Sequence, residues 1–248
     1  MTRKSTTLLS LVSGFFFVAQ AFGTTYYVSS SSGSDSNNAT SMSAPWKTIT
    51  KVNGGAYNPG DSILFKAGDT WSGSPNFSAA LITPFAGSSG SPITYGSYGT
   101  GASPILDGGN SLPTLITISH DYITITGLQL QNATRTWISY PGTNGTSITY
   151  VTGKNAGIWG FYGISGIGTT LIDHTTCTSD PNWTMTAWCH IAQGSGPVTF
   201  TNNTCDLRNV DPSTSGGGAL KSVAIPPQLS NTTTLMEVNR HSPSRQAP

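Results

Sequence analysis

The chain has 248 residues, only 8% of which are charged, and its formal net charge is +1. Such sparse and balanced charge supplies no basic surface for a phosphate backbone, so we expect no nucleic-acid partner. A hydrophobic fraction of 36% and an aromatic fraction of 10% exclude a disordered chain, because they suffice for a buried core.

The N-terminal segment, residues 1–23, has the pattern of an export signal. Arg3 and Lys4 give a basic start, residues 8–21 are largely apolar, and small residues lead up to a cleavage point after Gly23, with Ala21 as the alternative. No later segment has an apolar run long enough to cross a bilayer. We therefore expect a secreted protein, extracellular or periplasmic, with no membrane partner and a monomeric state.

The residues that follow form a distinctive opening. Tyr26-Tyr-Val-Ser comes first, then Pro45-Trp-Lys-Thr-Ile49, then a strand-like run over residues 59–71 and another over residues 92–108. This opening is similar to the N-terminal signature of right-handed parallel β-helix proteins of the pectin lyase-like superfamily. As a pattern the resemblance extends over residues 24–211, and it implies an all-β solenoid.

A repeat supports the same fold class. The segment ITITGLQL from Ile123 and the segment VTFTNNTC from Val198 match in pattern, and their starting positions differ by 75 (198 − 123), which is three steps of 25. Ile148 falls on the first step, whereas Cys177 precedes its counterpart Cys205 by 28 (205 − 177). A period of this length is typical of one turn of a solenoid, in which equivalent side chains stack on each other.

These patterns divide the chain into three parts. We predict a signal peptide over residues 1–23 and a parallel β-helix over 24–211. Within the β-helix, residues 24–110 form the N-terminal cap and first coils, and residues 111–211 form the repeating coils. Because the β pattern stops, residues 212–248 are expected to be an irregular or disordered tail, so that the solenoid is incomplete at its C-terminal end.

The resemblance also implies a class of chemistry. Relatives of this kind include lyases that act on acidic polysaccharides, using Lys or Arg as the base and often Ca²⁺ held by Asp and Glu. A lyase must remove the proton next to the uronate carboxylate and stabilise the resulting negative charge. The sequence lacks a paired-Asp and Gly-His-Gly set, which counts against hydrolysis by a polygalacturonase-type pair of carboxylates.

The candidate site residues are polar side chains expected on the outside of the coils. We predict as catalytic Asp173, Arg208 and Lys154, and as substrate-binding His174, Asp180 and Trp183. Asp173 is equivalent to Thr201 of the next coil, on a strand face where a carboxylate adds nothing to the core. His174 beside it corresponds to Asn202, so a role in the turn is the alternative for this residue.

Asp180 and Arg208 are separated by the same step of 28 (208 − 180) and should be neighbours on adjacent coils. A surface ion pair is one interpretation, and capture of a substrate carboxylate by the guanidinium of Arg208 is the other. By the same spacing Cys177 should stack next to Cys205, either as a disulfide or as a reduced pair.

The sequence is consistent with three functions. The first is a lyase-type enzyme on an acidic, pectate-like or alginate-like polysaccharide. The second is a noncatalytic carbohydrate-binding or adhesive β-helix. The third is ice binding, suggested by the Thr-x-Thr pairs at Thr124 and Thr199, although Val151 and Asp173 interrupt that ladder.

Overall fold

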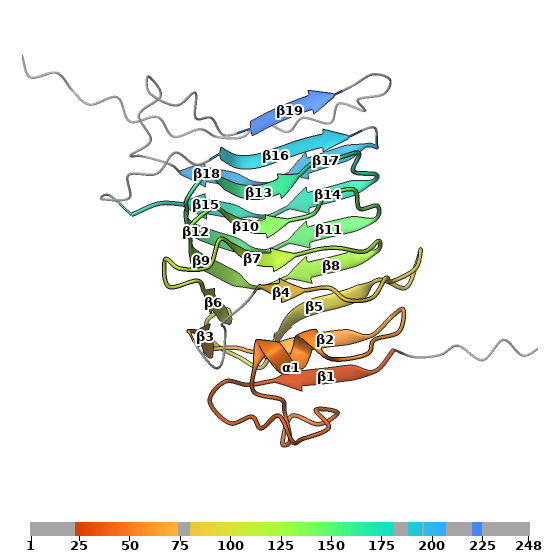
Figure 1. The fold of residues 1–248 in the computed structure, drawn as a ribbon, viewed down its shortest axis with the longest axis vertical. Helices are drawn as coiled ribbons and strands as arrows, with labels where there is room; N and C mark the ends of the chain where they lie inside the picture. Colours follow the sequence, from red (N-terminus) through yellow and green to blue (C-terminus); the bar gives the residue numbers. More distant parts are fainter. Residues whose placement is uncertain (1–22, 74–79, 181–187, 195, 207–219, 225–248) are drawn as a thin grey trace, which may run out of the picture.

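The protein is described here by a computed structural model, which defines residues 23–73, 80–180, 188–194, 196–206 and 220–224. Its strands form three all-parallel sheets that wind about a common axis, and each coil adds a strand to the stack (Figure 1). This is a right-handed parallel β-helix, which confirms the predicted fold class. Among the described residues, no helix is long and apolar enough to span a bilayer.

The three sheets are named A, B and C in the order in which each coil passes through them. Sheet A contains β1 (Thr25–Val28), β2 (Ser62–Lys66), β5 (Ile93–Tyr98), β8 (Ile123–Thr126), β11 (Thr146–Thr149), β14 (Thr170–Asp173) and β17 (Val198–Thr201). Sheet B contains β3 (Thr70–Ser72), β6 (Ile105–Asp107), β9 (Gln129–Ala133), β12 (Thr152–Ala156), β15 (Thr176–Thr178) and β18 (Thr204–Asp206). Sheet C contains β4 (Leu81–Ile82), β7 (Thr114–Thr117), β10 (Thr136–Ser139), β13 (Trp159–Gly163), β16 (Trp188–Gly194) and β19 (Leu220–Ala224).

The core is a set of stacked like residues. In sheet A, Ile125, Ile148 and Ile172 lie in register on consecutive strands and are fully buried, and Phe200 continues the column. Their neighbours along each strand face outward, because successive side chains of a strand point to opposite faces. Burial of each isoleucine contributes about 1.5–3 kcal/mol. The core therefore grows coil by coil along the axis.

Sheets A and B are joined by two-residue turns in the later coils. The first residue of the turn has a left-handed backbone at Tyr150 (φ 53), His174 (φ 50) and Asn202 (φ 51). The predicted equivalence of His174 and Asn202 is thus confirmed. Such a backbone is uncommon outside Gly, Asn and Asp, and the short turn fixes the register of the strand that follows.

The predicted register is correct over three coils but wrong at the first step. Ile148 pairs with Ile125, not with Ile123, and the column continues through Ile172 to Phe200. The successive steps along this column are 23 (148 − 125), 24 (172 − 148) and 28 (200 − 172). The last step is longer because residues 179–187 connect β15 to β16, where the two preceding coils use two residues between sheets B and C. This longer connection leads off from the corner that carries Asp180.

The helix α1 (Ile49–Asn53) lies beside β1 and β2 at the N-terminal end of the solenoid (Figure 1). Its first turn is capped by Thr48, whose hydroxyl oxygen accepts a hydrogen bond from the backbone N–H of Lys51 (3.1 Å). Ile49 and Val52 are buried against the first coils. The helix therefore covers apolar surface that the first coil would otherwise expose.

The two ends of the chain differ in how far the structure describes them. Residues 1–22, which hold most of the expected signal peptide, lie outside the described part. In the segment expected to be an irregular tail, β19 is a strand, and it pairs with β16 as the next member of sheet C.

The cysteines pair differently from the two alternatives considered. Cys177 and Cys205 stack in register, but the disulfide joins Cys205 to Cys189, and Cys177 is a buried free thiol. Burial raises the pKa of the Cys177 thiol well above its usual value. The bridge connects sheet C of one coil to sheet B of the next.

Candidate functional site

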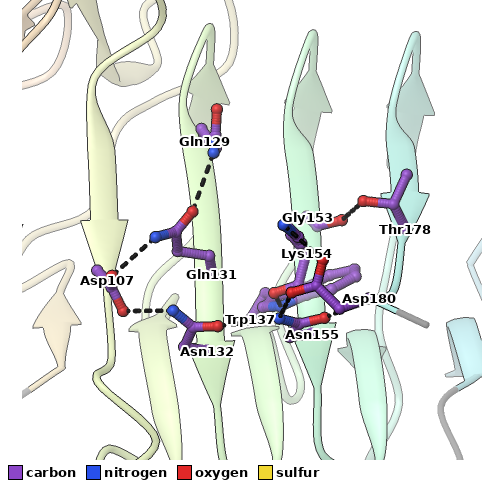
Figure 2. A network of polar contacts seen from close by, with 10 residues as sticks. All are labelled: Asp107, Gln129, Gln131, Asn132, Trp137, Gly153, Lys154, Asn155, Thr178 and Asp180. Carbon is purple, nitrogen blue, oxygen red and sulfur yellow. Dashed lines mark hydrogen bonds and ion pairs between the residues drawn. The ribbon is translucent and has the colours of Figure 1, made fainter. Parts of the chain in front are cut away.

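A row of polar side chains runs across the outer face of sheet B, over several coils (Figure 2). Asp107, Gln131, Lys154 and Thr178 occupy one register row on β6, β9, β12 and β15. The residues just before them in sequence, including Leu106, Leu130 and Cys177, are buried and face the core. Strict alternation thus places an uninterrupted line of polar groups on the outside.

The first half of this row is held together by Asp107. Its Oδ2 accepts a hydrogen bond from Gln131 Nε2 (2.7 Å), and its Oδ1 accepts one from Asn132 Nδ2 (2.9 Å) and one from the N–H of Gly109 (2.8 Å). Gln129 Nε2 donates to Gln131 Oε1 (3.0 Å). The carboxylate of Asp107 is therefore an acceptor whose oxygens already have donors.

The second half passes through the corner between sheets B and C. Asn155 is nearly buried, and its amide donates both to Asn132 Oδ1 (3.1 Å) and to Asp180 Oδ2 (2.9 Å). In return, Asn155 Oδ1 accepts from the backbone N–H of Asp180 (2.9 Å). Asn132 and Asn155 both have φ near 58, a left-handed corner conformation that asparagine tolerates.

Lys154 stands at the end of this network. Its ammonium lies 2.7 Å from Asp180 Oδ1, and the two side chains are 40% and 48% exposed. The hydrogen bond from Asn155 and the contact with Lys154 both lower the pKa of the Asp180 carboxyl. Two of the predicted residues are thus brought together, as an accessible pair of opposite charges on a fixed support.

The geometry limits what Lys154 can do. Its ammonium contacts Asp180, and its side chain is still 40% exposed, so a second anionic group can reach it. Lys154 is therefore suited to bind an anionic group or to stabilise negative charge that develops during a reaction.

The calcium ion implied by the family resemblance does not fit these residues. Within the described part of the chain, no three His, Cys, Asp or Glu side chains cluster closely enough to hold a metal ion. Calcium needs several free oxygen ligands, whereas the oxygens of Asp107 already accept three hydrogen bonds.

Asp173 and His174 lie elsewhere, at the corner between sheets A and B. Asp173 Oδ1 accepts hydrogen bonds from Thr201 Oγ1 (2.7 Å) and Asn202 Nδ2 (3.0 Å), and its Oδ2 lies 2.7 Å from His174 Nδ1. These contacts, with that of Thr201 the largest, lower the pKa of the Asp173 carboxyl to about 2. The ring of His174 stacks on Tyr150, with centroids 4.7 Å apart.

The predicted catalytic role for Asp173 stays a prediction, but its surroundings indicate a different use. A carboxylate that accepts hydrogen bonds from the next coil and has so low a pKa is a weak base. It is well suited to tie two coils together. Two other candidates, Arg208 and Trp183, lie outside the described residues.

The Thr-x-Thr pairs that suggested ice binding lie on the outer face of sheet A. Leu171 and Asp173 occupy the outward positions of β14 between Ser147 and Thr149 on one side and Thr199 and Thr201 on the other. Val151, which was expected to interrupt the ladder, is instead fully buried at the corner. The outer face of sheet A is thus not a continuous threonine array.

Sequence reasoning did not identify the asparagine and glutamine members of the row, nor Arg135. From residue 80 to residue 206 the chain contains two Lys or Arg residues, Arg135 and Lys154. Both belong to the junction of sheets B and C, on consecutive coils. The scarcity of positive charge in the coils is a signal that the sequence already contained.

Comparisons with known proteins give the fold and a short local likeness. No family model matches the chain. A lacto-N-biosidase from Bifidobacterium longum subsp. longum is 47% identical over 79 residues, which is 31% of this chain and 5% of that protein. A match of this extent covers a small part of the relative.

Two solved structures share the architecture. A rhamnogalacturonan lyase has a TM-score of 0.55 at 18% identity, covering 75% of this chain and 51% of that one. The pectate lyase Pel9A has a TM-score of 0.52 at 21% identity, covering 73% and 47%. The chain thus spans about half the length of each, and the likeness confirms the parallel β-helix fold that the opening motif implied.

Proposed function

We propose that this protein is a secreted, carbohydrate-active β-helix of the polysaccharide lyase type, which acts on an acidic polysaccharide. The observation that carries the proposal is Lys154, an exposed cation held on a hydrogen-bonded row in a solenoid with very few other positive charges. The two lyases of the same fold support the reaction class by analogy. Export is supported by the basic and apolar pattern of residues 1–23.

In the proposed reaction, the ammonium of Lys154 binds the carboxylate of a uronate residue. Neutralising that carboxylate makes the adjacent C–H more acidic and stabilises the enolate-like charge that forms when a Lys or Arg base of the family type takes the proton. The electron pair then forms a C=C bond and the glycosidic C–O bond breaks, so that the oxygen leaves with the neighbouring sugar and takes up a proton. Asp180 and Asn155 keep the ammonium in place. Arg208 keeps the role that the sequence suggests for it, the capture of a substrate carboxylate by its guanidinium.

The first test is the absorbance at 235 nm, where unsaturated uronate products absorb, with pectate, alginate and glycosaminoglycans as substrates. Each substrate is assayed with Ca²⁺ and with a chelator, because the calcium requirement is part of the family expectation. A rise in absorbance is expected with at least one acidic polymer. Retention of a glycan without any product would replace the lyase with a carbohydrate-binding module.

The role of Lys154 is tested by substitution. Lys154→Ala is expected to lower kcat/KM about 100-fold, the size of effect that follows loss of one stabilising charge, while Lys154→Arg keeps part of the activity. Lys66→Ala, which removes a cation from β2, is the matched control and should leave the rate unchanged. Equal rates for Lys154→Ala and wild type would remove Lys154 from the reaction.

The local likeness to a lacto-N-biosidase motivates one further assay. Release of a disaccharide from a lacto-N-biosidase substrate, with no change at 235 nm, would identify a glycoside hydrolase instead.

A further inference from the structure

A second feature lies on the outer face of sheet C, around the corner from Lys154. Trp159 and Tyr162 stack with ring centroids 4.1 Å apart and an interplanar angle of 6°. The guanidinium of Arg135 lies 5.6 Å from the centre of the Trp159 ring. Each of these side chains is at least partly exposed.

The strand geometry explains why two aromatic residues three apart share the outer face. Phe161 between them is fully buried, and a Cβ added at Gly160 would meet the core ring of Trp137 at 2.6 Å. Gly160 and Phe161 therefore both face inward, which is a local departure from strict alternation. Trp159 and Tyr162 are the two positions of β13 that remain outside.

Small hydroxyl residues lie beside the rings. Tyr162 is in register with Ser139 of β10, which is in register with Thr117 of β7. Both are partly exposed, and within the described residues neither hydroxyl makes a side-chain hydrogen bond. An aromatic surface next to available hydroxyl groups matches a sugar ring, which has apolar C–H faces and a hydroxyl rim.

Arg135 adds a positive charge beside the aromatic pair, which favours a ligand with a negative charge. Its backbone carbonyl is fixed by the N–H groups of Ile158 (2.8 Å) and Trp159 (2.9 Å), so the turn is well anchored. Among the described carboxylates, none lies within ion-pair distance of the guanidinium. A planar guanidinium without a carboxylate partner is a good receptor for a carboxylate or sulfate group.

We propose that Arg135, Trp159 and Tyr162 form a glycan-binding surface that takes an anionic sugar residue of a polysaccharide. The pyranose ring packs on the face of Tyr162 that the stacked Trp159 does not cover, its hydroxyls reach Ser139 and Thr117, and the carboxylate or sulfate of this sugar or of its neighbour binds Arg135. This surface lies on sheet C, whereas Lys154 faces outward from sheet B. The surface and Lys154 would therefore contact different sugar residues of the same polysaccharide chain. The proposal rests on the substrate class of the proposed function, but not on catalysis.

The test separates binding from cleavage. Affinity electrophoresis in gels that contain pectate, alginate, a sulfated glycosaminoglycan or neutral galactan reports retention, and absorbance at 235 nm reports cleavage independently. Arg135→Gln is expected to weaken retention by the acidic polymers about tenfold and to leave weak retention by galactan unchanged. Tyr162→Ala and Trp159→Ala are expected to weaken retention by all retaining polymers about tenfold.

The controls come from the same chain. Lys51 lies 5.6 Å from the ring of Trp46 in the N-terminal cap, so Lys51→Gln removes an equivalent cation–ring contact far from the proposed surface. It should retain wild-type mobility, and thermal unfolding verifies that each variant is folded.

Two results would overturn the proposal. One is unchanged retention in all three surface variants, even if the 235 nm assay shows a lyase. The other is retention that Lys154→Ala abolishes while Arg135→Gln does not alter it, because binding would then lie on sheet B alone. Loss of retention in the three variants supports the surface even if no polymer is cleaved, in which case the lyase proposal alone fails.

Discussion

At the level of single residues, the outward polar side chains fall into two groups. Asp107, Asn155 and Asp173 use their oxygens or amides to connect one coil to the next, and their hydrogen bonds are made within the protein. Lys154 and Arg135 keep their charges accessible. Residues of the first group therefore affect stability, and those of the second affect what binds to the surface.

The contacts of Asp173 lead to a prediction about pH. Because its pKa in the folded protein is about 2, below the usual value near 3.9 in an unfolded chain, ionised Asp173 stabilises the fold at pH values above about 4. This contribution is lost as the pH falls from about 4 to about 2. Asp173→Asn is expected to lower the free energy of unfolding by about 1 kcal/mol at pH 7 and by much less near pH 2.

Denaturant unfolding at a series of pH values measures this difference. Thr199→Ala is a suitable control, since Thr199 lies on the same outer face and its side chain makes no described hydrogen bond. An effect of Asp173→Asn that is equal at both ends of the pH range would show that the charge of Asp173 is not involved.

The candidate site was only partly predictable from sequence. Lys154, Asp180 and His174 were selected as exposed polar residues, and the structure indeed places them outside. The pairing of Lys154 with Asp180 was missed because the two residues are not at equivalent positions of their coils. The observed step of 24 (178 − 154) aligns Lys154 with Thr178, and Asp180 lies two residues farther on, after the end of β15.

At the level of strands and turns, close packing inside the solenoid controls which residues fit. Gly153 of β12 occupies the core column between Leu130 and Cys177, where its neighbours have larger side chains. A Cβ at Gly153 would overlap the ring of Trp137. The indole of Trp137 also donates a hydrogen bond to the carbonyl of Lys154 (3.1 Å), so the ring supports the strand that carries the candidate site.

We therefore expect Gly153→Ala to lower the free energy of unfolding by about 1–3 kcal/mol, the usual range for overpacking a core. Gly54→Ala is the control, because a Cβ there has no neighbour closer than 3.6 Å. The double variant Gly153→Ala with Trp137→Phe should lose less stability than the sum of the single variants, because the smaller ring makes room. Strict additivity in a thermal or denaturant series would contradict this account.

The architecture itself was more predictable than the site. Matching segments at Ile123 and Val198 are indeed three coils apart, since the observed steps of 23, 24 and 28 also add to 75. The individual steps could not be read from the pattern, because the connections between sheets differ in length. Nor does the pattern reveal that two successive positions of β13, Gly160 and Phe161, both face the core, which places Trp159 and Tyr162 on the outer face.

At the level of the whole molecule, each coil packs on its two neighbours, so stability depends on the links between successive coils. The Cys189–Cys205 disulfide is one such link, and it closes a loop with a sequence separation of 16. Reduction is expected to lower the free energy of unfolding by about 3 kcal/mol, as estimated for a loop of this length.

Unfolding with and without a reductant measures the effect. Cys189→Ser should match the reduced wild type, whereas Cys177→Ser should still respond to reductant, because Cys177 takes no part in the bridge. A Cys177→Ser variant that no longer responds would indicate that the bridge in solution involves Cys177.

The two-residue turns between sheets A and B also have a consequence for how such a chain can evolve. An insertion or deletion of one residue there would exchange the inner and outer faces of the following strand, and the damage would be borne by the core. From β8 to β18 the connection between sheets A and B is two residues in every coil, whereas the connections at the other two edges differ in length, from two residues up to nine between sheets B and C. In these coils new loops can therefore accumulate beside Lys154 and Trp159, while the edge between sheets A and B keeps its length.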